Sequence, residues 1–169
     1  MSATDTRLDP VDLRRACGQF ATGVAVVATR SGGRPIGMTI NSFASVSLEP
    51  PLVLWSLRNS AHSRTAFARA DGFSISILAA PQIDLARRFA GSHDDPFEGV
   101  AIETSSGLPL ISGALAHLVC ETRRIHDGGD HQILVGEVTD LAVFGGEPLV
   151  FVAGRFATGL SHLEPVGAK

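Results

Sequence analysis

A run of small polar residues at positions 37–47 carries side chains whose types and spacing could do chemistry. The run reads Gly-Met-Thr-Ile-Asn-Ser-Phe-Ala-Ser-Val-Ser and holds five hydrogen-bonding side chains within nine residues. In an extended chain the odd-numbered positions point the same way; these are Thr39, Asn41, Phe43, Ser45 and Ser47. A core-facing strand would carry apolar residues there, so this side would suit a flat, polar ligand. A solvated edge strand with ordinary surface hydroxyls explains the same pattern, and spacing alone does not separate the two.

A second candidate, Asn59-Ser60-Ala61-His62-Ser63-Arg64, lies where a predicted strand ends and a predicted helix begins. Exposed backbone N–H groups, hydroxyls and an arginine at such a place would suit a phosphate. Simple N-capping of the helix by Ser60 is the alternative, and it is the more common reason for a serine there.

Metal, zinc and nucleophile sites find little support in the sequence. His126 and His131 flank the turn Asp127-Gly128-Gly129-Asp130, but a metal would need more ligands than this segment offers, so we expect no metal site. Cys17 and Cys120 have no CxxC spacing, which excludes a zinc site or a disulfide framework. The sequence contains neither a Gly-x-Ser-x-Gly elbow nor a Gly-x-x-x-x-Gly-Lys loop, so it predicts no hydrolase or phosphoryl-transfer site.

Glycines, prolines and apolar spacing predict the elements that must position these side chains. Three helices are expected: one capped by Asp9 with Leu13, Ala16, Cys17 and Phe20 on its apolar face, one from Ser60 to Ala70, and one opened by Pro81. The expected strands cover 24–30, 35–40, 52–57, 73–78, 114–126, 131–144 and 149–153, and residues 91–113 are expected to form a long loop with one short strand.

About seven strands joined mostly by hairpins predict an antiparallel barrel with peripheral helices. A Rossmann sheet is not expected, because no strand leads through a glycine-rich turn into a crossover helix. The 169 residues are 44% hydrophobic and 18% charged with a net charge of −3, as expected for one folded domain. No basic cluster suggests nucleic-acid binding, the apolar stretches are too short to span a bilayer, and the start lacks a signal-peptide core. We therefore expect a cytoplasmic protein.

Five segments in the same order resemble the short-chain flavin reductases, the reductase components of two-component flavin-dependent monooxygenases in the FMN-binding split-barrel superfamily. They are Thr39–Ser47, Pro50-Pro51-Leu52, Arg88-Phe89-Ala90, Gly129-Asp130-His131 and Gly154-Arg155-Phe156. The likeness extends from about Leu13 to Leu160. It implies a mainly β antiparallel split barrel with peripheral helices, as a single domain over 1–169 with its core at about 13–160.

The resemblance also implies an activity and partners. The chain would be a homodimer that binds FMN or FAD, reduces it with NADH or NADPH, and supplies the reduced flavin to a separate monooxygenase. Hydride transfer is chemistry that the two cofactors supply, so no catalytic dyad or triad is expected. Two alternatives remain: a non-catalytic flavin-binding carrier or sensor, and an oxidase of the wider superfamily acting on a pyridoxine-like substrate.

Residue roles follow from the same resemblance. The residues implied to hold the flavin are Thr39, Asn41, Ser42 and Phe43 at the isoalloxazine ring, Ser45 and Ser47 along the ribityl chain, Asn59, Ser60 and Ser63 near the phosphate, and Phe89 and Ala90 closing the pocket. Gly129, Asp130 and His131 match the motif associated with nicotinamide binding, and Arg155 belongs to the same neighbourhood. His131 is the predicted catalytic residue, positioning the nicotinamide. Phe156 departs from the family, in which tyrosine is frequent at this place.

Overall fold

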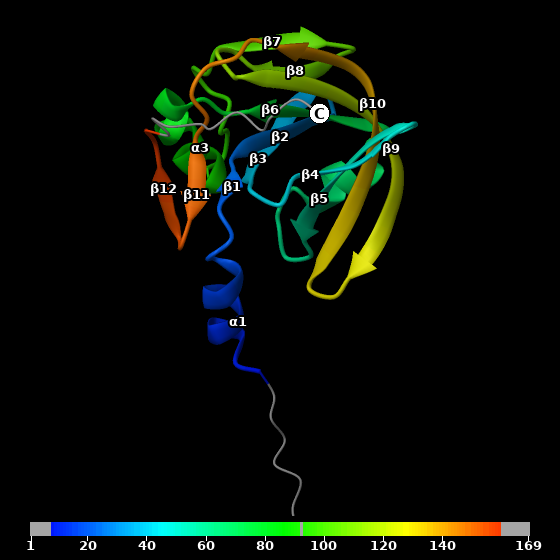
Figure 1. Ribbon diagram of the computed structural model, residues 1–169. Coiled ribbons are helices and arrows are strands. Elements are labelled where there is room, and N and C mark those ends of the chain that lie inside the picture. The colour runs from blue at the N-terminus through cyan, green and yellow to red at the C-terminus, as the bar shows by residue number, and fades with distance from the viewer. Residues whose placement is uncertain (1–7, 92, 160–169) are drawn as a thin grey trace, which may run out of the picture.

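The computed structural model describes residues 8–91 and 93–159 and is built on a seven-stranded sheet (Figure 1). Its strand order is β3-β2-β6-β9-β10-β5-β4, and every pairing in it is antiparallel. The strands are β2 Ala25–Ser31, β3 Arg34–Ile40, β4 Ala44–Leu48, β5 Pro51–Arg58, β6 Gly72–Ile77, β9 Ala116–Gly128 and β10 His131–Val143. The predicted hairpin turns at 31–34 and 127–130 are confirmed, with positive φ at Gly32, Gly33 and Gly129.

The two edge strands of this sheet, β3 and β4, are consecutive in the chain. Only residues 41–43 separate them, so Ile40 and Ala44 lie at most about 14 Å apart. The sheet must therefore curl until its edges approach each other, which makes it a barrel split between β3 and β4. The predicted antiparallel split barrel is confirmed.

Two smaller sheets complete the fold. One contains β1 Thr22–Gly23, β11 Val150–Val152 and β12 Arg155–Ala157, and the other pairs β7 Ile102–Ser105 with β8 Leu108–Ile111. The prediction of a loop with a single short strand over 91–113 was wrong. The tight turn at Ser106 and Gly107, both with positive φ, folds this segment into a hairpin instead.

The described helices are α1 Pro10–Cys17, α2 Arg64–Arg69 and α3 Ile83–Ala90, with a short 3₁₀ turn, η1 Ala80–Gln82, before α3. Asp9 caps α1 as predicted, since its carboxylate accepts a hydrogen bond from the Val11 N–H at 2.8 Å. The apolar face predicted for this helix would be expected to pack on the core, but α1 projects from the body of the molecule and none of its residues, including Cys17, is buried (Figure 1).

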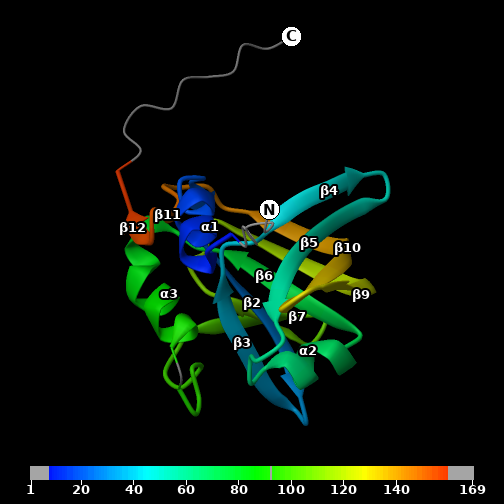
Figure 2. The ribbon, with the colours of Figure 1, turned by 90° about the horizontal axis from the view of Figure 1, so that it is seen from below.

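The core consists of two clusters on the two faces of β2. Ala25 and Val27 face the barrel interior with Trp55, Leu57, Phe67, Phe73 and Leu134, whereas Val24, Val26 and Ala28 face α3 with Leu78, Phe89 and Phe97. A strand buried on both faces explains the uninterrupted apolar run at 24–28. Figure 2 shows α3 and α2 on either side of β3, the arrangement that frames the site described below.

Candidate functional site

A cleft of about 600 Å³ opens between β3, α3 and the segment that leads into α2. Met38 and Thr39 line it from β3, Ala61 and Ser63 from the segment before α2, and Ala90 from the end of α3. Four predicted flavin-site residues are brought together here: Thr39, Ser63, Phe89 and Ala90. The volume lies within the range of small-molecule and cofactor sites.

A smaller pocket of about 140 Å³ adjoins the cleft and shares Thr39 and Ala90 with it. The predicted residue Asn41 lines this pocket, together with Phe151 and Phe156. These two rings meet edge-to-face with centroids 5.4 Å apart. Phe156, at the position where the family often has tyrosine, therefore gives this pocket an apolar wall.

The polar run at 39–47 does not form one continuous face, so that prediction was wrong. Residues 41–43 belong to no strand, and β4 carries a bulge between Ser45 and Ser47. Ser45 pairs with Val53 and Ser47 with Leu52, which places the two serines on opposite sides of the strand pair. One extra residue in β4 is enough to break the alternation on which the prediction depended.

Most hydroxyl groups of this run already bond to the protein. The Thr39 hydroxyl donates to the Ala86 carbonyl of α3 at 2.8 Å, and the Ser42 hydroxyl accepts from the Ser56 N–H of β5 at 2.9 Å. The Ser47 hydroxyl accepts from the Glu49 N–H at 3.2 Å. Within residues 8–91 and 93–159, the exposed Asn41 amide has no hydrogen-bond partner, so both its donor and its acceptor are available to a ligand.

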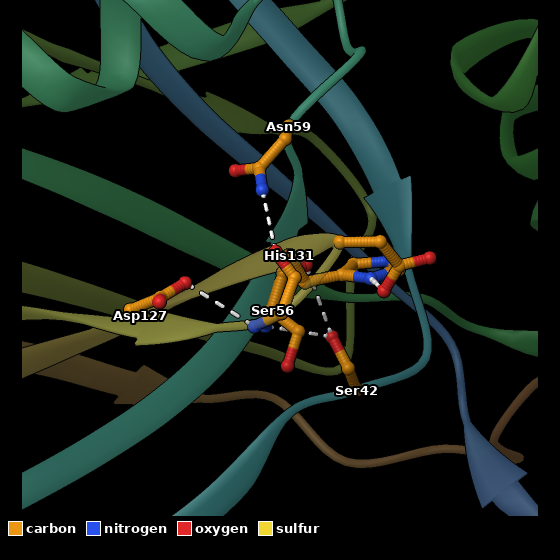
Figure 3. Close-up of polar contacts among 7 residues, drawn as sticks. Ser42, Ser56, Asn59, Asp127 and His131 are labelled. Atoms are coloured by element: carbon orange, nitrogen blue, oxygen red, sulfur yellow. Dashed lines mark hydrogen bonds and ion pairs between the residues drawn. The ribbon is translucent and has the colours of Figure 1, made fainter.

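The predicted nicotinamide motif lies at the tip of the β9–β10 hairpin (Figure 3). His131 Nδ1 lies 2.6 Å from Asp130 Oδ1. An ionised carboxylate can only accept, so Nδ1 carries the proton and Nε2 is the nitrogen left to face a ligand. This hydrogen bond from His131, with the charge of the imidazole and of Arg58, lowers the pKa of Asp130 below its ordinary value of 3.8.

Strand β5 brings the predicted flavin and nicotinamide residues next to each other. Val53, Trp55 and Leu57 point into the barrel, so Ser56 and Arg58 point outward. His131 is paired with Arg58 on one side of β5, and Ser42 bonds to Ser56 on the other side. Figure 3 shows the contact between Ser42 and Ser56, with His131 nearby. Ser42 and His131 therefore lie across a single strand, two residues apart in register.

The remaining predicted residues lie outside the two pockets. Ser60 is exposed in a turn, and the prediction that it caps α2 was wrong, because the helix begins at Arg64 with Ser63 at its N-cap position. Phe43 packs against the core of the barrel, and Ser45 and Arg155 are exposed.

Sequence reasoning missed several residues that line the cleft, among them Met38, His62 and Thr65. His62 and Thr65 lie within or beside the 59–64 segment already singled out, so proximity to it was the available signal. The sequence held no such signal for Met38, because an apolar residue in a strand is normally interpreted as a core residue. The Ser63 hydroxyl lies 3.5 Å from the Met38 sulfur and links the two walls of the cleft.

A flat, partly polar ring system fits this cleft, which combines apolar walls at Met38 and Phe89 with an open amide at Asn41 nearby.

In the described part of the chain no group of three or more His, Cys, Asp and Glu side chains could hold a metal ion. Nor does any helix among those residues have the length and apolar character to span a membrane. Burial raises the pKa of the Cys120 thiol to about 12, so this thiol stays protonated and unreactive.

Comparison with known proteins gives consistent matches. Residues 17–160 match the family model described as "Flavin reductase like domain". The FMN reductase (NADH) SmoA of Agrobacterium fabrum is 46% identical over 144 residues, which cover 85% of this chain and 82% of that protein. The reductase subunit HsaB of a flavin-dependent monooxygenase from Rhodococcus jostii is 39% identical, covering 95% and 83% of the two chains.

A solved structure agrees with the sequence matches. The NADH:FAD oxidoreductase SgcE6 of Streptomyces globisporus, in complex with NAD and FAD fragments, superposes with a TM-score of 0.85 at 40% identity. The superposition covers 95% of this chain and 96% of that one.

Proposed function

Because the chain belongs to the flavin reductase like domain family, we propose that it reduces FMN or FAD with NADH or NADPH and supplies the reduced flavin to a separate flavin-dependent monooxygenase. One observation supports this proposal most directly: the predicted flavin residues and the predicted nicotinamide residues lie on the two sides of β5. Ser42 bonds to one side of this strand, and His131 pairs with the other side. A hydride donor and its acceptor must lie next to each other, and this strand brings the two motifs together. A non-catalytic flavin carrier is not favoured, since the relatives are reductases.

The residues on the flavin side would bind and orient the ring. Asn41 offers an amide that no other described residue engages, Phe89 and Ala90 offer apolar contact, and Ser63 offers a hydroxyl inside the cleft. Thr39 would act mainly through its backbone and methyl group, because its hydroxyl donates to Ala86. When bound, the flavin supplies the electron-accepting chemistry, so the protein need only hold it in place.

On the nicotinamide side, the Asp130–His131 pair would orient the incoming dinucleotide. Asp130 holds the Nδ1 proton of His131 and thereby fixes which ring nitrogen faces the ligand. His131 is one-third exposed, so a visiting molecule can reach Nε2. Correct orientation of two reactants can contribute several kcal/mol or more to lowering a barrier, and no proton transfer by the protein is required for it.

The direct test is an assay of purified protein with each nicotinamide and each flavin, following loss of absorbance by the reduced nicotinamide. We expect NADH or NADPH to be oxidised with at least one of the two flavins. We also expect this oxidation to require flavin, whether added or already bound. Tight flavin binding with no oxidation by either nicotinamide would instead favour the carrier.

The finer features of the assembly are part of the same proposal. A homodimer is supported by exposed apolar side chains on β4 and at the end of β10, and its test is given in the Discussion. A separate oxygenase partner is supported by relatives named as monooxygenase reductase subunits or components. The single domain over 1–169 and the cytoplasmic location stay predictions.

A further inference from the structure

Asn59 lies between the two halves of the proposed site and is bonded to one of them. Two residues after it, Ala61 lines the cleft. The Asn59 side-chain Nδ2 donates to the Gly129 carbonyl at 2.8 Å (Figure 3). The Asn59 backbone N–H donates to the Asp130 carbonyl at 2.9 Å. Two consecutive carbonyls of the motif that carries His131 are thus held by a single residue.

We propose that Asn59 is a positioning residue for the nicotinamide, acting through the 129–131 turn on His131 rather than by contact with the flavin phosphate. This inference rests on the proposed function. It differs from the role that the family resemblance implied for Asn59, because the structure directs the amide donor of the side chain toward the turn and not toward the cleft.

Besides Asn59 and the β9–β10 pairing itself, the turn has few supports: the Asp127 carboxylate accepts from the Gly129 N–H at 3.2 Å, and His131 pairs with Arg58 of β5. The turn is the tip of a hairpin of two 13-residue strands, and the β9 residues that lead to it are exposed from Arg123 to Gly128. Asp130 is 87% exposed on its side chain. A hairpin tip without buried apolar contacts opens locally at low cost, and any tilt of the tip would carry His131 with it.

The phosphate role is the weaker explanation on donor count. One N–H of the Asn59 amide and its backbone N–H are already engaged by the turn. The side-chain oxygen that remains is an acceptor, which a phosphate cannot use. Asn59 therefore has only one N–H left that could donate a hydrogen bond to a phosphate.

The test compares Asn59→Ala with Ser105→Ala. The control removes a hydrogen bond at 3.0 Å to Asp140, on the same strand β10 but toward its other end. For Asn59→Ala we expect the KM for NADH to rise about three- to tenfold, the loss of one hydrogen bond, with kcat within about twofold and flavin affinity unchanged. Ser105→Ala should change none of these constants. Asn59→Leu is similar in size, lacks the donor and adds no charge, so it gives the same test if the alanine variant folds poorly.

Two further measurements do not depend on turnover. Hydrogen exchange at residues 128–131 should quicken in Asn59→Ala and not in Ser105→Ala, and NADH binding to the flavin-free protein, followed by calorimetry, should weaken.

A double variant tests whether the two residues act together. In a His131→Ala background, Asn59→Ala should add little to the KM for NADH, because both changes act through one group.

The opposite results would overturn the inference. A raised flavin Kd with an unchanged KM for NADH would support the role of Asn59 near the flavin phosphate instead. Full additivity of Asn59→Ala with His131→Ala would show that Asn59 does not act through His131. Unchanged hydrogen exchange at the turn would remove the support itself. A wild-type protein that oxidises no nicotinamide would instead reject the proposed function, and the exchange measurement would remain interpretable.

Discussion

At the scale of single residues, the most informative feature is that polar side chains near the site are already committed to protein partners. Thr39 and Ser42 each use a hydroxyl to join two elements, and Asp130 holds the ring of its neighbour His131. The Asn41 amide has no hydrogen-bond partner in the described part of the chain. Residue type alone could not separate the side chains that build the site from those that would touch a ligand, because serine, threonine and asparagine serve both purposes.

His131→Ala is the first prediction at this scale. We expect the KM for NADH to rise about tenfold or more, as for loss of a hydrogen bond to a polar ligand group, while flavin affinity stays unchanged. The pKa of Asp130, followed by NMR, should rise toward its ordinary value, because the hydrogen bond from His131 is the main cause of its lowering. An unchanged KM would remove His131 from the site.

The pH dependence of this pair follows in sign from the same shift. A carboxyl whose pKa is lowered in the folded protein stabilises the fold above its unfolded pKa, and that contribution is lost as the pH falls through the folded value. Asp130 therefore stays ionised throughout the neutral range and keeps the Nδ1 proton of His131 in place there.

At the scale of elements, the sequence was a good guide wherever a local signal decided the structure. Consecutive glycines at 32–33 predicted the first hairpin, and Asp9 with Pro10 predicted the start of α1. The failures came where distant contacts decide. The bulge in β4 depends on its pairing with β5, and none of the other described residues buries the apolar face of α1. Of the predicted site, the motifs were brought together, but side-chain directions such as that of Asn59 depend on partners 70 residues away.

Gly136 in β10 gives a prediction about an element. A Cβ at this position would lie 2.4 Å from the Phe73 ring and 3.0 Å from Cys120 Cβ, inside the barrel core. Gly136→Ala should therefore lower the free energy of unfolding by about 1–3 kcal/mol, measured by urea denaturation. Gly23→Ala is the matched control, since its Cβ would meet no atom within 4 Å, and we expect a change within about 0.5 kcal/mol. Equal stability of the two variants would contradict the described packing.

At the scale of the whole molecule, the exposed large apolar side chains fall mainly into two groups, one in and around α1 and one on β4 and the end of β10. Val46 and Leu48 lie on the edge strand β4, and Leu141, Val143 and Phe144 lie at and just beyond the end of β10. Leu48 is 92% exposed and Val143 is 75% exposed. An unprotected edge strand beside exposed apolar residues is a surface that another chain can cover. A second copy of this chain, related by a two-fold axis, is the occupant we propose.

That proposal predicts the mass of the particle in solution. The wild-type protein should sediment at twice the chain mass of 17.7 kDa at micromolar concentration. The double variant Leu48→Glu, Val143→Glu should shift to the mass of one chain, because burying two carboxylates in an apolar interface costs several kcal/mol. Ala68→Glu, an exposed change on α2 outside this surface, should leave the dimer intact. A wild-type monomer, or a double variant that remains a dimer, would mean that these strands do not form the interface.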